Sequence, residues 1–345
     1  MSSKLKTEIT GEEDGFFHIL NLVENFCLCA ALKSLFTMKI YNYMHSKKKS
    51  STQDIANSLA LDPTRLEAFL LYLRNAGLVL KDSNGLWSVS DKLVRMQVYQ
   101  PWIEMMIGGY GITFLNLYDG LKDKNLILDR NEKYVGSGSC GISQFGALPL
   151  VKELIYKHEL KCDSVLDIGC GNGNYLYSLS QMLGKIEAYG IEPSEAVVLE
   201  ANNYLSKLGV SHHIKVFKGS AKDFDKVITE KPKVILICFV LHEILAQEGK
   251  QGVINFLKKI KNYFPLSKVV VIEIDEKFSE IKNKKIEQGY YNPYFLLHFF
   301  TNQKLETADF WRNMFADIGF KILEEKKISN KLDDTGIEVG FLLSS

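Results

Sequence analysis

Three glycines at alternate positions, between two short apolar runs, are the residues of this sequence whose types and spacing could do chemistry. Gly169, Gly171 and Gly173 follow an apolar run that contains Asp167, and a second apolar run, after a helical pattern, ends at Glu192. This order predicts a strand, a glycine turn, a helix and a strand, which is one βαβ unit. Glycine lets the backbone approach a ligand, and a carboxylate at the end of the second strand can accept both hydroxyls of a ribose.

Two classes of ligand use such a unit, and the glycine spacing separates them. Dinucleotide sites have the pattern G-x-G-x-x-G and hold a pyrophosphate at the helix N-terminus. Here the acid Asp167 precedes three glycines that are separated by single residues. The acid would repel a pyrophosphate but could hold a cationic amino-acid group. A nicotinamide oxidoreductase is therefore disfavoured, and a glycine turn without any ligand would leave the second acid unexplained.

The stretch 164–193 resembles the first motif of class I S-adenosylmethionine (SAM) methyltransferases. The resemblance implies SAM as cofactor and S-adenosylhomocysteine as product. The SAM contacts that it implies lie on the glycine turn and at the ends of the next strands: Asp167, Gly169, Gly171, Gly173, Glu192, Pro193, Ser220, Ala221, Cys238 and Phe239. In this class an acid often stands beside the adenine. Ser220 occupies that position here and Asp223 comes later, so the adenine contact stays open.

A histidine follows the fourth strand that we expect in this sheet, 234–238. A neutral imidazole at His242 can accept a proton near neutral pH while an acceptor attacks a sulfonium methyl group. The segment is similar to the V-L-H-D-W-like segment of winged-helix small-molecule O-methyltransferases from plants and bacteria, in which the histidine is the base. Glu243 and Ile244 replace its acid and its tryptophan. A histidine that only packs at a helix start is the alternative.

A third stretch, 288–303, places aromatic and polar residues between the fifth strand and the last helix, where methyltransferases of this type insert substrate-binding elements. His298 could face the same pocket as His242, or it could be a core histidine. The stretches around both histidines also look like the 2-ketoarginine methyltransferase group, which methylates 2-oxo acids beside the carbonyl. The site expected from these resemblances has His242, His298 and Glu243 as catalytic residues and Tyr134, Gln144, Tyr291, Asn292 and Tyr294 as substrate-binding residues.

The chemistry of 2-oxo acids gives the two histidines separate roles. The carbon beside the carbonyl becomes nucleophilic only after enolisation, so a base must remove a proton and another group must hold the enolate oxygen. His242 could be the base, and His298, alone or through a divalent metal, could hold the oxygen. Two histidines and one acid, Glu243 or Glu273, could form a facial metal site. Methylation at oxygen or nitrogen of a natural-product intermediate is the alternative, and a non-catalytic SAM-binding regulator is a further class.

The elements that must position these residues alternate between strand and helix, which predicts an α/β fold with helices on both faces of a Rossmann-like methyltransferase sheet. We expect this domain to span 136–345, and we interpret the glycine- and serine-rich segment 134–150 as a loop facing SAM and substrate. Beyond residue 193, strands are expected at 214–217, 234–238 and 268–274, helices at 196–208, 253–263 and 310–319, and a final strand pair at 322–326 and 336–343.

The part of the chain at 1–135 predicts a separate, mostly helical domain. Two capped helices and a hairpin, within 51–89, form a winged helix. DNA binding is disfavoured because the second helix offers mainly Arg65 and Arg74. The segment 16–43 is apolar nearly all round, so we expect it to be buried on more than one side, with a partner subunit as the second cover. The sequence therefore predicts a homodimer.

Composition and charge limit the class of partner. The 345 residues leave room for two domains, and a net charge of +1 with mixed acids and lysines indicates no nucleic-acid partner. We expect neither a signal peptide nor an apolar stretch of membrane-spanning length. The six cysteines are scattered, several of them inside apolar runs (Cys27, Cys29 and Cys238), which predicts buried thiols in a reducing cytoplasm. The expected protein is a cytoplasmic enzyme acting on a small molecule.

Overall fold

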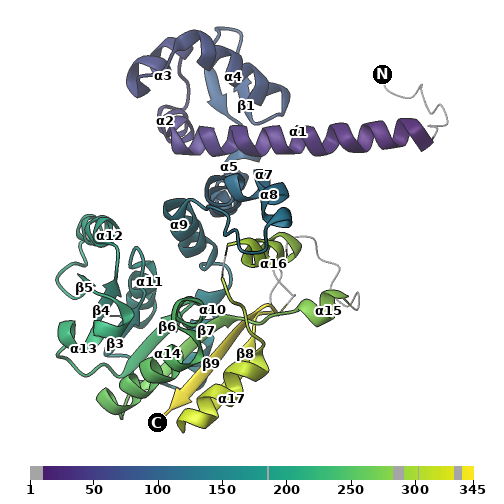
Figure 1. The fold of residues 1–345 in the computed structure, drawn as a ribbon. Coiled ribbons are helices and arrows are strands. Elements are labelled where there is room, and N and C mark those ends of the chain that lie inside the picture. Colours follow the sequence, from purple (N-terminus) through teal and green to yellow (C-terminus); the bar gives the residue numbers. More distant parts are fainter. Residues whose placement is uncertain (1–10, 185, 283–290, 302, 330–335) are drawn as a thin grey trace. The chain divides into compact units, whose positions relative to one another are not determined.

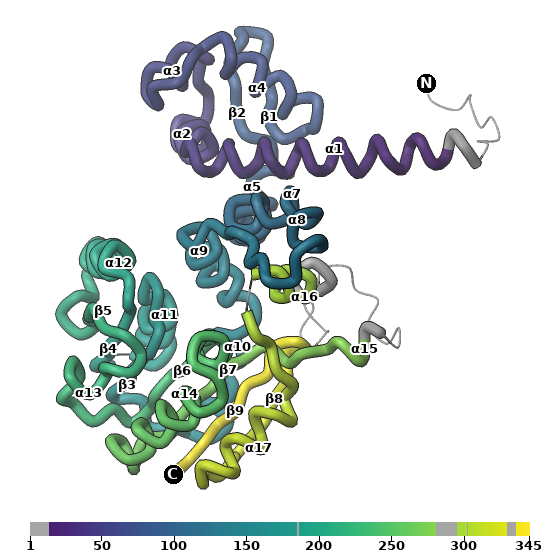
Figure 2. The backbone as a smooth tube through the Cα atoms, viewed as in Figure 1, coloured from purple at the N-terminus to yellow at the C-terminus, as the bar shows by residue number. Residues whose placement is uncertain are grey.

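The computed structural model describes residues 11–184, 186–282, 291–301, 303–329 and 336–345. The chain divides into two compact units, Met1–Gly109 and Tyr110–Ser345, and Figures 1 and 2 trace the path of the chain through both. Each unit is described by itself.

The second unit is built on a seven-stranded sheet with the order β5-β4-β3-β6-β7-β9-β8. The first five strands in this order are parallel, and β9 is antiparallel to both β7 and β8. The strand order reverses between β3 and β6, and such a switch point is where open α/β sheets bind ligands. The strands are β3 (Ser164–Ile168), β4 (Glu187–Glu192), β5 (Ile214–Lys218), β6 (Val234–Cys238), β7 (Lys268–Ile274), β8 (Lys321–Lys327) and β9 (Glu338–Ser344).

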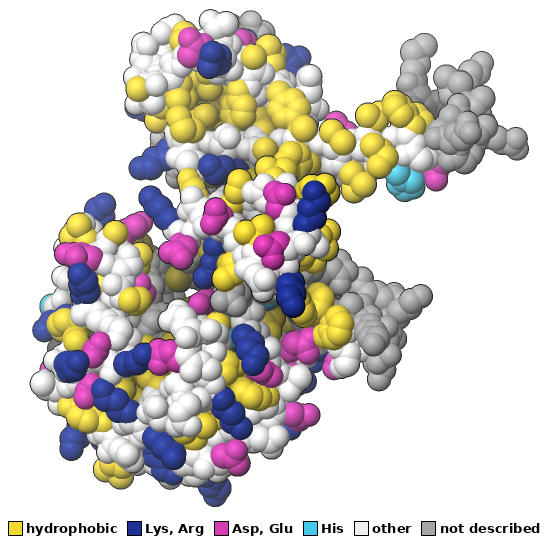
Figure 3. Space-filling model, in the orientation of Figure 1, with side chains coloured by type: hydrophobic (Ala, Val, Ile, Leu, Met, Phe, Trp, Pro, Cys, Tyr) yellow, Lys and Arg dark blue, Asp and Glu magenta, His cyan; other side chains and the backbone are white. Residues whose placement is uncertain are grey.

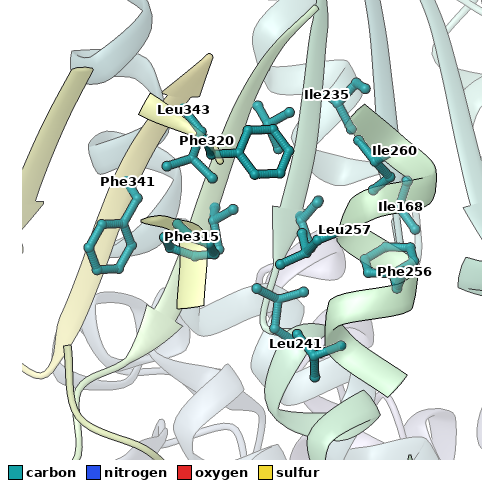
Figure 4. Packing of buried hydrophobic residues seen from close by; sticks show 14 of the residues in the cluster. Ile168, Ile235, Leu241, Phe256, Leu257, Ile260, Phe315, Phe320, Phe341 and Leu343 are labelled. Carbon is teal, nitrogen blue, oxygen red and sulfur yellow. The ribbon is translucent and has the colours of Figure 1, made fainter. Parts of the chain in front are cut away.

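Helices cover both faces of this sheet, which confirms the α/β fold expected from the sequence. Because side chains alternate along a strand, β6 contributes Ile235 and Ile237 to one core and Val234 and Leu236 to the other. The first core, seen in Figure 4, packs under α14 (Leu241–Tyr263) and α17 (Ala308–Ile318), together with the short α13 (Phe224–Val227). The second packs under α10 (Ala147–Lys157), α11 (Asn174–Leu183) and α12 (Glu195–Lys207).

Helix α14 is broken at Gly249, whose φ of 69° and ψ of −173° are not helical. The break separates a two-turn segment, 241–248, from the long segment that follows. Leu241, Ile244 and Leu245 bury one side of the short segment in the first core. The same short segment carries His242 and Glu243, two of the residues with predicted catalytic roles.

The helices that follow residue 110 in the chain belong to the second unit. Leu128 donates its backbone N–H to the carbonyl of Phe300 at 2.8 Å, and the Tyr110 hydroxyl donates to Gln303 at 3.0 Å. These contacts join α7 (Gly111–Leu115), α8 (Leu117–Lys122) and the segment after them to α16 (Tyr291–Phe300), which follows the short α15 (Phe278–Lys282). The division therefore falls before residue 110, whereas the boundary expected from the sequence follows residue 135.

The interpretation of 134–150 as a loop is wrong, because most of it is helical. Helix α9 (Glu132–Ile142) is capped by Asn131, the residue before it, whose side chain accepts the backbone N–H of Tyr134 at 3.3 Å. An asparagine cap of this kind satisfies one of the free donors at a helix start. The glycines and serines of the segment therefore give a helix with a small cross-section.

The first unit contains the expected winged helix. Helices α3 (Thr52–Leu59) and α4 (Pro63–Asn75) precede a hairpin of β1 (Val79–Lys81) and β2 (Trp87–Val89). Ser51 and Asp54 form a capping box at the start of α3. The remaining elements are α1 (Gly11–Thr37), α2 (Ile40–Lys47), α5 (Asp91–Gln97), α6 (Gln100–Ile103) and the π-helix η1 (Glu104–Gly109).

Helix α1 carries an exposed apolar surface along its first half. Phe16, Leu22 and Phe26 are 60%, 64% and 54% exposed, and Figure 3 shows hydrophobic side chains gathered along this helix. Within the described chain, the segment is thus not buried on two sides. Cys27 is exposed as well, so the expectation that this thiol is buried is wrong. Cys29 and Cys238, expected to be buried too, are only half-buried.

The same helix changes one expectation about membranes. Within the described residues, Asp14–Thr37 is 24 residues long and apolar enough to cross a membrane by length and composition. The expectation that no stretch reaches that length is therefore wrong. Length and composition do not distinguish a membrane span from a signal sequence, and with 6% of its apolar window buried this helix does not pack as the core helix of a globular domain does.

Candidate active site

A cavity of about 520 Å³ lies at the carboxyl ends of β3, β4 and β6, and we call it the first cavity. Its wall contains all but one of the residues that the sequence predicts for SAM: Asp167, Gly169, Gly171, Glu192, Pro193, Ser220, Ala221, Cys238 and Phe239. The exception is Gly173, which lies at the start of α11, where it is the residue before the first helical one. The structure thus brings the predicted cofactor residues together at the switch point of the sheet.

Two of the glycines are required by space as well as by backbone conformation. Gly169 and Gly171 have φ of +79° and +53°, the left-handed region that glycine adopts without strain. A Cβ on Gly169 would lie 2.6 Å from the side chain of Val240, and one on Gly171 would lie 2.7 Å from the sulfur of Cys140. Both distances are far below van der Waals contact, so a side chain at either position would displace its neighbour.

Asp167 places a buried carboxyl group at the base of the first cavity. Its side chain is 2% exposed, and no described residue hydrogen-bonds its carboxyl group. Burial, and then repulsion from Glu192, raises the pKa of Asp167 to about 7. A carboxylate held in this way gains most from a cationic partner.

Glu192 closes the other side of the glycine turn. Its two carboxylate oxygens accept the backbone N–H groups of Gly171 at 3.2 Å and of Ser194 at 3.0 Å. Burial raises the pKa of Glu192, although these two hydrogen bonds favour the ionised form. The backbone therefore fixes this carboxylate at the end of β4, where it faces the cavity.

At the third strand end, Ser220 replaces the acid that this class of enzyme often has. The Ser220 hydroxyl donates to Asp223 at 2.6 Å, and Asp223 is also paired with Lys226. Asp223 is not in the cavity wall, so the acid acts on the cavity only through the serine. Lys222 and Glu248, which do line the cavity, form an ion pair with each other.

Helix α9 contributes small side chains that the sequence analysis missed. They follow helical spacing and face the first cavity: Gly136, Ser139, Cys140 and Ser143. The half-buried Tyr134 and the exposed Gln144, both predicted to bind substrate, are not in this wall. The i, i+3, i+4, i+7 spacing of small residues is the signal that could have identified this face.

His242 is oriented by a fully buried glutamate on β7. The Glu273 carboxylate accepts the imidazole Nδ1–H at 2.7 Å with one oxygen, and with the other it accepts the backbone N–H groups of Leu241 at 2.8 Å and His242 at 3.3 Å. Burial by itself lowers the pKa of His242, but the attraction of Glu273 outweighs it, so the pKa lies above its ordinary value. Because Nδ1 donates to Glu273, the lone pair of the neutral ring is on Nε2.

The other two residues with predicted catalytic roles lie beside this imidazole. The ring of His298, on α16, has its centroid 6.4 Å from that of His242. The carboxylate of Glu243 lies 3.8 Å from His242 Nε2, and it also accepts a hydrogen bond from Gln303 at 3.0 Å and lies 3.6 Å from Arg130. Burial by itself raises the pKa of Glu243, but the charge of His242, the hydrogen bond from Gln303 and the charge of Arg130 together outweigh burial. The pKa of Glu243 therefore lies below its ordinary value.

Two further cavities continue from the first one. A second cavity, of about 320 Å³, shares Arg130, Glu243 and Gln247 with it. A third, of about 490 Å³, shares Gln303 with the second and has His298 in its wall. The side chains of the remaining predicted substrate residues, Tyr291, Asn292 and Tyr294, lie outside the described residues.

Comparison with known proteins identifies the family. Residues 165–262 match the family model described as a methyltransferase domain. The 2-ketoarginine methyltransferase of Streptomyces arginensis is 30% identical over 342 residues, which are 97% of each chain. The protein belongs to the 2-ketoarginine methyltransferase family.

Solved structures agree on the fold. A structure of LaPhzM has a TM-score of 0.66 at 12% identity and covers 95% of this chain and 98% of its own. The mitomycin 7-O-methyltransferase MmcR has a TM-score of 0.65 at 12% identity, covering 96% and 98%. A structure of PigF with S-adenosylhomocysteine has a TM-score of 0.64 at 13% identity, covering 97% and 99%.

The protein is therefore a SAM-dependent small-molecule methyltransferase related to natural-product enzymes. The residues of the first cavity fit SAM: Asp167 suits its cationic amino group, and Glu192 suits the ribose hydroxyls. Among the described residues, no three histidine, cysteine, aspartate or glutamate side chains are arranged to hold a metal ion. The family resemblance pointed to His242 and His298 as candidates, whereas Arg130 and Gln303 lie outside any motif, and their contacts with Glu243 become visible only in the folded chain.

Proposed function

We propose that this methyltransferase transfers a methyl group to the carbon beside the carbonyl of a 2-oxo acid. The observation that supports it is the pairing of His242 with the buried Glu273, next to His298 and beside the cavity that fits SAM. An imidazole with its lone pair on Nε2 is the base that enolisation requires. The relative in Streptomyces arginensis is named for the same substrate class, a 2-oxo acid.

In the proposed reaction, His242 Nε2 takes the proton from the carbon beside the carbonyl, and the electrons of that C–H bond move into the enolate. SAM, when bound, would supply an electrophilic methyl group on a positively charged sulfur: the enolate carbon would form the new C–C bond, and the electrons of the broken C–S bond would stay on the sulfur of S-adenosylhomocysteine. Glu273 and Glu243 stabilise the imidazolium that forms, because each holds a carboxylate within 4 Å of one ring nitrogen. The proton then leaves from the imidazolium to water, which restores the base.

Arg130 is suited to hold the carboxylate of the acceptor. It lines both the first and the second cavity, and its contacts with Glu243 at 3.6 Å and with the Tyr110 hydroxyl at 3.5 Å are long. A guanidinium that uses few of its five donors can take a carboxylate in a bidentate geometry. The other described cation in the wall of the first cavity, Lys222, is already paired with Glu248. In this proposal His298 holds the enolate oxygen directly, since no three ligating side chains among the described residues are arranged to hold a metal ion.

Replacement of His242 tests the proposal. His242→Asn should lower kcat for a 2-oxo acid by about 10²–10⁴, the usual scale for general acid–base catalysis, with the affinity for S-adenosylhomocysteine nearly unchanged. Neither His242 nor His213 lines one of the three cavities, but His242 is next to Glu243, which lines the first and second. His213→Asn is a matched control, because His213 is also buried but precedes β5, at the amino end of that strand and away from the first cavity. If the His242 variant folds, binds the product and methylates at the parent rate, the mechanism is wrong.

Product analysis and metal removal separate methylation at carbon from methylation at oxygen or nitrogen, and direct contact by His298 from contact through a metal ion. Mass spectrometry of the product locates the new methyl group, and a group on oxygen or nitrogen would contradict methylation at carbon while leaving SAM-dependent transfer intact. Exhaustive chelation should abolish activity if a divalent ion holds the enolate oxygen, and His298→Ala should then resemble His242→Ala. Activity that survives chelation supports direct contact by His298.

We also propose that the protein is a cytoplasmic homodimer formed through the first unit. The exposed apolar side chains of α1 support this, since patches of this kind on a chain with an ordinary polar surface mark interaction sites. A second copy covers them by presenting the same surface in return. A partner at α1 would also account for the apolar composition of this helix without a membrane.

A further inference from the structure

The third cavity extends the proposed reaction site toward α15 and α16. His298 lies in its wall, and it shares Gln303 with the second cavity, where Gln303 donates to Glu243. A 2-oxo acid held beside His298 therefore has room for its side chain in this volume of about 490 Å³. The inference that a residue of this wall selects the side chain of the substrate rests on the proposed function.

Three phenylalanines form one side of the third cavity. Phe278 stacks on Phe295 with ring centroids 5.1 Å apart and planes 15° apart, and Phe299 meets Phe295 edge-on at 4.9 Å. Phe278 and Phe299 are 46% and 69% exposed, so their faces are not covered by other described side chains. Aromatic faces attract cations as well as apolar groups.

The charged residues of this wall leave one carboxylate without a counter-charge. Lys304 and Glu306 pair with each other at 3.3 Å, whereas Glu276 makes no ion pair with a described residue. Glu276 accepts the backbone N–H of Phe278 at 2.5 Å, which fixes it beside the aromatic rings. The nearby acids Asp275 and Glu280 are themselves paired with Lys277.

We propose that Glu276 determines substrate specificity by selecting a 2-oxo acid with a cationic side chain. A carboxylate that has no ion-pair partner among the described residues, together with exposed aromatic faces in the same cavity, suits a guanidinium or an ammonium group. A neutral side chain of equal length would fill the same space but would leave the carboxylate desolvated and unpaired, which is unfavourable.

The test compares two substrates that differ only in this charge. They are 5-guanidino-2-oxopentanoate and its neutral isostere 2-oxo-5-ureidopentanoate, each assayed for kcat/KM with SAM. The ratio of the two values should favour the cation in the parent protein. Glu276→Gln should reduce that ratio by about 10- to 100-fold, the range for a lost charge-assisted hydrogen bond, and Glu276→Lys should favour the neutral substrate. Glu200→Gln, an exposed acid on α12, is the control that should leave the ratio unchanged.

Two readouts keep this result separate from folding and from the proposed reaction. Affinity for S-adenosylhomocysteine should be the same in all Glu276 variants, because Glu276 does not line the first cavity. In the parent protein, raising the salt concentration should raise KM for the cationic substrate more than for the neutral one, which needs no variant. If neither 2-oxo acid is methylated, the proposed function fails. If both are methylated and neither Glu276→Gln nor salt changes the ratio, the role of Glu276 is overturned while the reaction stands.

Discussion

The buried carboxyl group of Asp167 should make cofactor binding depend on pH. Its pKa of about 7 means that the empty site is partly protonated near neutral pH, and a cationic ligand must drive that proton off. Affinity for S-adenosylhomocysteine should therefore fall as the pH drops from 8 to 6. Calorimetry at pH 7 in two buffers of different ionisation enthalpy should show a proton released on binding.

Asp167→Asn provides the control. The variant should bind the product more weakly at every pH and should lose the proton release. Wild-type affinity that is constant between pH 6 and 8 would contradict the assignment of the amino-group contact to Asp167. Glu192 lies on the same cavity, so Glu192→Ala should also weaken binding, by about 1.5–3 kcal/mol for each charged hydrogen bond that is lost.

Glu273 should set the pH range of catalysis. In the proposed mechanism His242 acts as a base only when neutral, and its pKa is raised, so activity should increase with pH through a value above that of an ordinary histidine. Glu273→Gln removes the attraction and leaves burial, which lowers the pKa, so the acid limb of the kcat profile should move to lower pH. The maximal rate should also fall, because the imidazole is held less firmly. A limb that does not move would contradict the pairing.

The same pairing affects stability with the opposite dependence on pH. A folded-state pKa above the unfolded value contributes stability that is fully present below the unfolded pKa of about 6.5 and is lost as the pH rises through the folded value. His242 thus stabilises the fold most where it is protonated and inactive. Activity and this part of the stability are expected at different pH values.

At the scale of elements, the contact between α9 and the glycine turn should be sensitive to a single methyl group. Gly171→Ala adds a Cβ 2.7 Å from the sulfur of Cys140 and forces alanine into a left-handed conformation. Gly209→Ala imposes a positive φ in open space, so it isolates the cost of strain, about 1–3 kcal/mol.

Thermal unfolding should show a larger loss for Gly171→Ala than for Gly209→Ala, and product affinity should fall only in the former. Adding Cys140→Ala to the Gly171 variant should restore part of both, because it removes the atom in the way. Equal losses in the two single variants would show that α9 does not press on the turn.

Much of the second unit could be predicted because local pattern and tertiary structure agree there. Apolar runs bounded by polar turns placed β6 and β7 at their observed residues. Helix α9 was missed because glycine and serine have low helical propensity, and packing of its small side chains against the glycine turn outweighs it. Arg130 and Gln303 could not be found from sequence, since their contacts with Glu243 join segments far apart in the chain.

At the scale of the whole molecule, the exposed surface of α1 should control assembly. Leu22→Glu together with Phe26→Glu places two charges on side chains that are 64% and 54% exposed, so neither disturbs the described core. Light scattering should give a dimer mass for the parent protein at micromolar concentration and a monomer mass for the double variant. Leu266→Glu, at a 93% exposed position in the second unit, should remain a dimer. A parent protein that is monomeric would contradict the proposal.

The boundary between the units illustrates what sequence patterns do not report. The helices after residue 110 have no motif, and their membership is decided by contacts such as that of Leu128 with Phe300. Composition placed a domain end at the glycine-rich segment, but a Cβ on its Gly146 would collide with the carboxylate of Glu338, so this glycine allows a close approach. Chain flexibility and close approach use the same residue, so glycine alone does not mark a linker.

The break at Gly249 has a consequence for how order is distributed in time. A two-turn helix is too short to be stable alone. Residues 241–248 are therefore stabilised by the hydrogen bond to Glu273 at one end and by the burial of Leu241 and Leu245 in the first core. The rest of α14 is anchored over more than three turns and can keep its amide protons protected when the short segment opens. The segment that carries His242 and Glu243 can therefore open independently of the rest of the domain. A bound ligand can slow this local opening without changing the global stability of the domain.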